Sequence, residues 1–186
     1  MEIARPSALI VIDVQRGFTD PSFGQRNNPS CEANVGRLIE AHRRAGEAVV
    51  FVRHDSQEPG SPLAPGSWGN AFKEVITGDP DLLVTKRVHS AFYGQPDLDH
   101  WLQERRVASL TICGITTDHC CSSTARMAGD LGYQTVFALD ATHTFDREVG
   151  PRHVVPADQV AFVTAASLNG EFATVATTEQ ILRALL

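Results

Sequence analysis

The sequence predicts an α/β fold in which a parallel sheet lies between two layers of helices. Short apolar runs rich in β-branched residues alternate along the chain with segments whose apolar residues recur at helical spacing. The runs are almost continuously apolar, as is typical of strands buried on both faces. Repeated alternation of this kind forms right-handed strand–helix–strand units around one sheet. With 186 residues and 42% hydrophobic side chains, we expect one compact domain over residues 1–186.

The elements can be placed in order along the chain. The first strand is the run ALIVID at residues 8–13, and the second is AVVFVRH at residues 48–54. Between them, apolar residues at helical spacing and a closing glycine predict a helix over residues 31–46. Residues 55–69 are so rich in Pro, Gly and Ser that they predict a loop. Further strands are expected at residues 82–88, 109–114, 134–140 and 171–177, and further helices at residues 96–107, 117–132, 156–170 and 178–186.

Composition and charge argue against several classes of protein. The net charge is −6 and the Lys and Arg residues are scattered, so we expect no nucleic-acid partner. The apolar run near the N-terminus spans about six residues, which is too short for a signal peptide or a membrane span. We therefore expect a cytoplasmic protein with no membrane partner. Its four cysteines are too irregularly spaced for a disulfide scaffold, and the absence of a Cys-x-x-Cys pair argues against a structural zinc site.

Polar residues stand at the carboxyl ends of the predicted strands, where ligands bind in parallel sheets. Asp13 ends the first strand, His54 and Asp55 end the second, and Lys86 ends the third. Cys120 falls in the turn after the fourth strand, within about a turn of the predicted helix start. The acid, the lysine and the thiol could therefore converge in one pocket.

Such a trio supports acyl transfer to water through a thioester. The helix N-terminus and Lys86 favour the thiolate of Cys120, which lowers its expected pKa. Asp13 can accept the thiol proton and later give it to a leaving nitrogen, while backbone amides of the turn bind the oxyanion. Plainer roles exist for each residue: an Asp can cap a helix, a Lys can be solvated and a Cys can fill a core. We assign Cys113 to the core and Cys31 to the core or the surface.

Three stretches together resemble the isochorismatase-like cysteine hydrolases: ALIVIDVQRGF, VTKRVHSAFYG and CGITTDHCCSSTARMAGDLGY. That family includes nicotinamidases, N-carbamoylsarcosine amidases, ureidoacrylate and biuret amidohydrolases, and isochorismatase. The resemblance runs from Ala8 to about Thr177. It implies a six-stranded parallel sheet of strand order 3-2-1-4-5-6, a small-molecule substrate, and assembly into dimers or tetramers.

The resemblance also assigns roles to the motif residues. Asp13 matches the general base, Lys86 matches the lysine of the third strand, and Cys120 matches the nucleophile. Cys121 falls where relatives have a small apolar residue, so it is expected to pack in the core. The family carries a non-proline cis peptide in this turn, here between residues 115 and 116, which aims the backbone amides of Thr116 and Cys120 at the substrate carbonyl oxygen.

Substrate choice in this fold depends on side chains around the pocket. Several of the candidates are aromatic, which suggests a flat or apolar amide, ureide or ring substrate. Arg126 and Arg147 could pair with a substrate carboxylate or could hold helix ends or an interface. The expected substrate-binding residues are Phe18, His54, Trp68, Phe92, Tyr93, Thr117, His119 and Phe145.

No catalytic metal and no other cofactor are expected. Metal-dependent nicotinamidases place an Asp-x-His pattern and further histidines around the ion. Here Asp55 matches the Asp, but Gln57 stands at the first His position and no further His follows before His89. His54 alone does not make such a site. The lack of a metal site weakens the case for nicotinamidase as the activity.

The leading hypothesis is a cysteine amidohydrolase that cleaves a small amide or carbamoyl C–N bond. One alternative is vinyl-ether hydrolysis of the isochorismatase type, which needs no acyl-enzyme. A second is a redox-sensing thiol protein that uses the neighbouring Cys120 and Cys121, although a disulfide between neighbours is strained. A third is a binding domain that has kept the pocket without catalysis.

Overall fold

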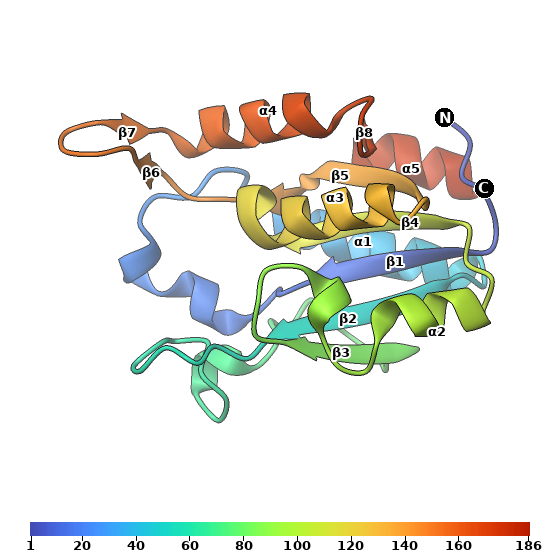
Figure 1. Ribbon diagram of the computed structural model, residues 1–186, viewed down its shortest axis with the longest axis horizontal. Coiled ribbons are helices and arrows are strands. Elements are labelled where there is room, and N and C mark those ends of the chain that lie inside the picture. Colours follow the sequence, from blue (N-terminus) through green and yellow to red (C-terminus); the bar gives the residue numbers. More distant parts are fainter.

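A twisted six-stranded parallel sheet forms the centre of the computed structural model, which describes residues 1–186 (Figure 1). Its strand order is β3-β2-β1-β4-β5-β8, and every neighbouring pair is parallel. This confirms the predicted order 3-2-1-4-5-6, because the sixth strand of the sheet is β8. The strands are β1 (Ser7–Ile12), β2 (Ala48–His54), β3 (Leu82–Lys86), β4 (Ser109–Ile115), β5 (Gln134–His143) and β8 (Thr174–Ala176).

Helices cover both faces of the sheet (Figure 1). Side chains alternate along β1, so Leu9 and Val11 enter one hydrophobic cluster while Ile10 and Ile12 enter another. The first cluster includes buried residues of α1 and α5, and the second includes buried residues of α2 and α3. The helices are α1 (Cys31–Arg44), α2 (Leu98–Glu104), α3 (Ser122–Asp130), α4 (Ala157–Leu168) and α5 (Thr178–Leu185).

The predicted elements differ from the observed ones mainly at their ends. A π-helical turn (Thr117–Cys121) precedes α3, where the sequence predicts one continuous helix. The last strand is shorter than predicted, and β5 runs on to His143. A small hairpin of β6 (Arg147–Glu148) and β7 (Val154–Val155) projects from the body and is not predicted (Figure 1). Each of its strands has two residues, too few for any periodicity to be recognised.

Gly114 allows β4 to approach β1 closely just before the turn that carries Cys120. Its φ is +125°, and a Cβ at this position would lie 2.0 Å from the Ile12 carbonyl oxygen. The pairing of β4 with β5 shifts register between Ile112 and Gly114. Only glycine fits this combination of backbone conformation and close contact. Gly114 therefore fixes the point at which the chain leaves the sheet towards the cavity.

No helix in the structure has both the length and the apolar character that crossing a membrane requires.

Candidate active site

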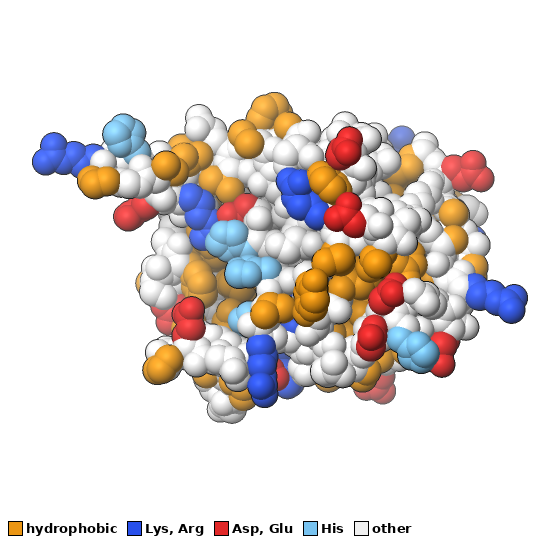
Figure 2. Space-filling model, in the orientation of Figure 1, with side chains coloured by type: hydrophobic (Ala, Val, Ile, Leu, Met, Phe, Trp, Pro, Cys, Tyr) orange, Lys and Arg blue, Asp and Glu red, His pale blue; other side chains and the backbone are white.

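A cavity of about 640 Å³ opens at the carboxyl ends of the central strands. Asp13, which directly follows β1, and Cys120, in the turn after β4, both line it. Residues 56–63, from the long loop after β2, form much of one side. Figure 2 shows neighbouring histidine side chains on one face of the molecule, flanked by Lys or Arg side chains. The position agrees with the rule that parallel sheets bind ligands beyond their carboxyl ends.

Asp13, Lys86 and Cys120 meet at the buried end of this cavity. The Lys86 ammonium donates to Asp13 Oδ2 at 2.6 Å and to Cys120 Sγ at 3.3 Å. The side chains of Asp13 and Lys86 are 0% exposed, so their charges interact without screening by water. The three residues lie at or just beyond the carboxyl ends of three different strands, and the sheet brings them together as their positions in the sequence predict.

His54 completes the surroundings of the lysine. Its Nδ1 lies 3.3 Å from Lys86 Nζ, at the end of β2. Burial and then the positive charge of Lys86 lower the pKa of His54, so at neutral pH its ring is neutral and can accept from the ammonium. The backbone of His54 is held by Gln15, which donates to its carbonyl at 3.0 Å and accepts from its amide at 2.9 Å.

The same atoms bear on whether the site fits a metal ion. Asp13, His54 and Cys120 each offer a ligand atom, and these atoms lie within 4.8 Å of one another. The Lys86 ammonium contacts all three, so a positive charge already occupies the position that the ion would need. Asp55 is also engaged, because its carboxylate accepts from Arg53 at 2.8 Å and from the Asn70 side chain at 3.0 Å. These residues therefore do not fit a divalent cation while Lys86 is charged.

The structure corrects one expectation about the thiol. Burial, followed by the negative charge of Asp13, raises the pKa of Cys120, and Lys86 only partly opposes this shift. The helix terminus and the lysine can be recognised in the sequence, whereas the burial of the thiol depends on the fold. For Lys86, burial acts to lower the pKa, but the charges of Asp13 and Cys120 outweigh it and the pKa is raised. The resting site therefore holds a neutral thiol, a charged ammonium and, in Asp13 Oδ1, a buried oxygen without a hydrogen-bond partner.

The turn after β4 presents backbone amides to the cavity. The peptide bond between Ile115 and Thr116 is cis. Thr116 lines the cavity, and its amide makes no hydrogen bond within the protein, whereas its carbonyl accepts from the Cys121 amide at 3.1 Å. The Thr116 amide is thus free to bind an oxygen beside Cys120 Sγ.

Only some of the expected substrate-binding residues line the cavity that contains Cys120. Phe18, His54 and His119 do so. Phe145 does not line the cavity but packs behind Phe18, with its ring centroid 6.4 Å from that of Phe18. The buried Thr117 hydroxyl donates to Thr142 Oγ1 at 2.8 Å and is already satisfied.

Three aromatic candidates lie elsewhere. Trp68 is 67% exposed and stands under the Arg16 guanidinium, outside this cavity. Phe92 packs against Tyr133, with ring centroids 6.2 Å apart. Tyr93 lines a neighbouring hollow that also reaches Lys86. These three residues stand in loops and short turns. Their positions could not be predicted, because no local sequence pattern determines the conformation of a loop.

Some lining residues were missed by sequence reasoning. Phe23 stands beside Phe18, with ring centroids 5.0 Å apart, and both line the cavity. His89 lines it too, and its ring meets that of His119 at 5.5 Å. Both missed residues follow a strand end that carries a catalytic candidate, and this proximity is the signal that could have found them.

Arg147 extends from the hairpin into the cavity wall and is fixed there by Asp118. Its Nε donates to Asp118 Oδ2 at 2.8 Å and its Nη2 donates to Oδ1 at 3.1 Å. Arg126, in contrast, donates to Ser167 Oγ at 2.7 Å and lies over the Phe172 ring. Arg126 therefore joins α3 to α4, and only Arg147 remains a candidate for contact with a substrate.

The Asp118–Arg147 pair predicts a loss of stability in acid. Burial acts to raise the pKa of Asp118, but hydrogen bonds from Arg147 and Thr144 outweigh it and lower the pKa to about 2. Since this folded-state pKa lies below the unfolded value, the pair stabilises the fold above about pH 4 and loses that contribution as the pH falls towards 2. We expect Asp118→Asn to remove about 2 kcal/mol of this acid dependence, measured by urea unfolding between pH 5 and pH 2. Equal slopes for the variant and the wild type would contradict the assignment.

Comparisons with known proteins agree with this fold and arrangement. The family model described as isochorismatase domain matches residues 7–180. An uncharacterized isochorismatase family protein of Bacillus subtilis is 36% identical over 176 residues, covering 94% of each chain. Nicotinamidase 3 of Arabidopsis thaliana is 33% identical over 158 residues, covering 77% of this chain and 76% of the relative.

A solved structure gives the same result. A protein of the isochorismatase family from Chromobacterium violaceum superimposes with a TM-score of 0.93 at 34% sequence identity, covering 100% of this chain and 96% of that one. The resemblance inferred from the three motifs is thereby confirmed. The chain belongs to the isochorismatase family and is a hydrolase of that family.

Proposed function

We propose that the protein hydrolyses the C–N bond of a small amide or carbamoyl compound through a thioester on Cys120. The contact of one buried ammonium, that of Lys86, with both Asp13 and Cys120 carries this proposal. A nucleophile beside an acid–base group and a fixed positive charge is the arrangement that covalent acyl transfer requires. Similarity to a relative named as a nicotinamidase supports amide chemistry.

In the first half-reaction, Asp13 takes the proton of the Cys120 thiol as Sγ attacks the carbonyl carbon. The raised pKa of the thiol makes this proton transfer necessary, because little thiolate exists in the resting enzyme. The C=O bond becomes a C–O⁻ bond, and the amides of Thr116 and Cys120 stabilise its charge. The C–N bond then breaks, and the leaving nitrogen takes the proton held by Asp13.

In the second half-reaction, water replaces the departed amine. Asp13 removes a proton from this water, whose oxygen attacks the thioester carbon. The C–S bond breaks, the acid is released, and the sulfur regains a proton from Asp13. Lys86 stays protonated throughout, as its raised pKa favours, and balances the negative charge that moves between Asp13 and Cys120.

Burial argues for Cys120 as the nucleophile rather than for a redox pair with Cys121. Cys121 is 0% exposed and packs in the hydrophobic cluster under α3, while Cys120 lines the cavity. Burial raises the pKa of both thiols, so access to the cavity, and not the pKa, distinguishes them. A substrate in the cavity therefore reaches one thiol and not the other.

The size and lining of the cavity suit a small, flat substrate. The rings of Phe18 and Phe23 form an apolar side, and the imidazoles of His89 and His119 form a polar one. A cavity of about 640 Å³ accommodates a compound of drug-like size or smaller. Planar amides, ureides and carbamoyl compounds match this shape.

A partitioning experiment tests the thioester directly. The protein is incubated with a panel of small amides and carbamoyl compounds that share an acyl group and differ in the leaving nitrogen, in the presence of hydroxylamine. We expect the ratio of hydroxamate to acid to be the same for every leaving group, because all pass through one acyl-enzyme. A ratio that changes with the leaving group would exclude this intermediate, and turnover of vinyl ethers alone would favour the chemistry of isochorismatase.

A further inference from the structure

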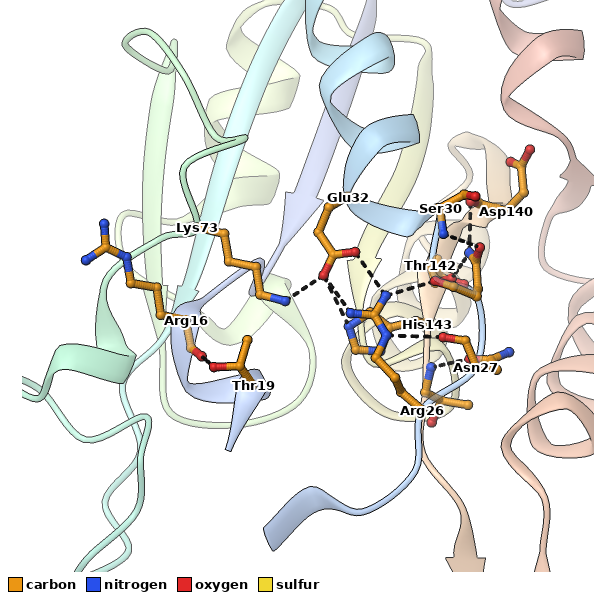
Figure 3. Close-up of polar contacts among 12 residues, drawn as sticks. Arg16, Thr19, Arg26, Asn27, Ser30, Glu32, Lys73, Asp140, Thr142 and His143 are labelled. Carbon is orange, nitrogen blue, oxygen red and sulfur yellow. Dashed lines mark hydrogen bonds and ion pairs between the residues drawn. The ribbon is translucent and has the colours of Figure 1, made fainter. Parts of the chain in front are cut away.

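Glu32 lies at the centre of a charge cluster that the proposed chemistry does not use. It is the second residue of α1, and Figure 3 shows its carboxylate between Lys73 on one side and Arg26 on the other. Oε1 accepts from Lys73 Nζ at 2.6 Å and from Arg26 Nη1 at 2.7 Å, and Oε2 accepts from Arg26 Nη2 at 2.9 Å. The side chains are only 13–28% exposed, so these ion pairs are weakly screened by solvent.

The two cations belong to the two chain segments that form the sides of the cavity. The first, here called the N-terminal wall (residues 16–26), carries Phe18 and Phe23 and ends at Arg26. The second, here called the loop wall (residues 55–73), carries the lining residues 56–63 and ends at Lys73. One carboxylate therefore holds both walls.

The beginning of the N-terminal wall is fixed to the end of the loop wall in another way. The Arg16 amide donates to the Ala71 carbonyl at 2.9 Å, and the Lys73 amide donates to the Val14 carbonyl at 2.9 Å. These bonds hold the walls side by side near the sheet. Further along the N-terminal wall, Arg26 is bridged to Phe145, whose ring lies 5.2 Å from that of Phe23. A shift of Arg26 is thus transmitted to the aromatic lining of the cavity.

The charges of the cluster depend on this one acid. Neither Arg26 nor Lys73 makes an ion pair with any other carboxylate. His143 also lies beside the cluster, with its Nε2 3.9 Å from Glu32 Oε1. Burial and the charges of Arg26 and Lys73 lower the pKa of His143 to about 3. The ring is therefore neutral and does not offset the positive charges of Arg26 and Lys73. Without Glu32, two half-buried cations would face each other across the walls and repel.

We propose that Glu32 is a positioning residue that sets the width of the substrate cavity by holding the N-terminal wall against the loop wall. It does not touch the reacting atoms. This inference rests on the proposed function only in that the cavity is the substrate site. Loss of Glu32 would weaken the fit of a substrate and therefore raise KM. The residues that carry out the reaction at Cys120 would be unchanged, so kcat would change little.

The test compares Glu32→Gln with Glu40→Gln in the full-length protein. Glu40 lies on the same helix, is exposed and pairs only with Arg44, so it is a matched control. Glu32→Gln keeps the shape of the side chain and removes its charge. We expect KM to rise about tenfold while kcat stays within about twofold, and amide hydrogen exchange to quicken in both walls. Glu40→Gln should change none of these.

A second substitution separates repulsion from simple loss of contacts. In the Glu32→Gln background, Lys73→Met leaves one cation in the cluster, so KM and the exchange rate of the N-terminal wall should return towards the wild-type values. An unchanged KM, faster exchange confined to α1, or no rescue by Lys73→Met would overturn the proposal. If the wild type cleaves none of the amides, the proposed function fails, and the exchange rates alone then decide on Glu32.

Discussion

Replacing Cys120 with alanine is expected to reduce amide turnover by roughly 10⁴-fold or more while leaving the fold intact. The thiol supplies the new bond to the substrate carbon, and no other nucleophile lines the cavity at the same place beside Asp13 and Lys86. The substitution removes one sulfur atom from a residue that is 7% exposed, so we expect only a small loss of folding stability. Steady-state ammonia release and the thermal melting temperature together provide the measurement.

Cys121→Ala is the matched control for this prediction. It removes the same atom from the next residue, which is fully buried in the core under α3. We expect turnover within a few-fold of the wild type and a modest loss of stability from the small cavity. Equal inactivation by both substitutions would indicate a role for the pair, and full activity of Cys120→Ala would eliminate the thioester mechanism.

Replacing Lys86 with methionine is expected to abolish turnover and to destabilise the protein by about 3–5 kcal/mol. The substitution leaves the Asp13 carboxylate buried without a counter-charge, since both side chains are 0% exposed and Lys86 provides its only ion pair. Chemical denaturation at neutral pH measures the loss of stability, and ammonia release measures the loss of turnover.

The double variant Asp13→Asn, Lys86→Met keeps this prediction testable if the single variant folds poorly. It removes both buried charges together, so we expect much of the lost stability to return while turnover remains absent. A single Lys86→Met variant as stable as the wild type would show that the ion pair contributes no net stability. Recovery of turnover in the double variant would exclude both residues from the chemistry.

The fold could be predicted from the sequence because its signals are local. Runs such as that of β1 are apolar on both faces, and the chain order of strands and helices leaves few topologies. The convergence of Asp13, Lys86 and Cys120 follows from the same rule, since Lys86 ends a strand, Asp13 directly follows one and Cys120 lies in the turn after another. The residues that stand at the strand ends can therefore be identified from the sequence.

Other features depend on contacts between distant segments and could not be predicted. The raised pKa of Cys120 depends on its burial and on the approach of Asp13, which lies 107 positions earlier in the sequence. The sequence gives no indication that Glu32 pairs with Lys73, because 41 positions and a long loop separate them. The position of Trp68 in the loop after β2 predicts that it lines the pocket, but the path of that loop places it outside the cavity.

The strand order also has a consequence during synthesis on the ribosome. β1 is made first and pairs early with β2, but its other neighbour is β4, which begins at Ser109. Until that strand emerges, the most central strand keeps one edge and several apolar side chains uncovered. An open edge of this kind invites pairing with other chains. The nascent protein is therefore most vulnerable to aggregation over the stretch of translation between the second and the fourth strand, a period in which chaperones have the most to protect.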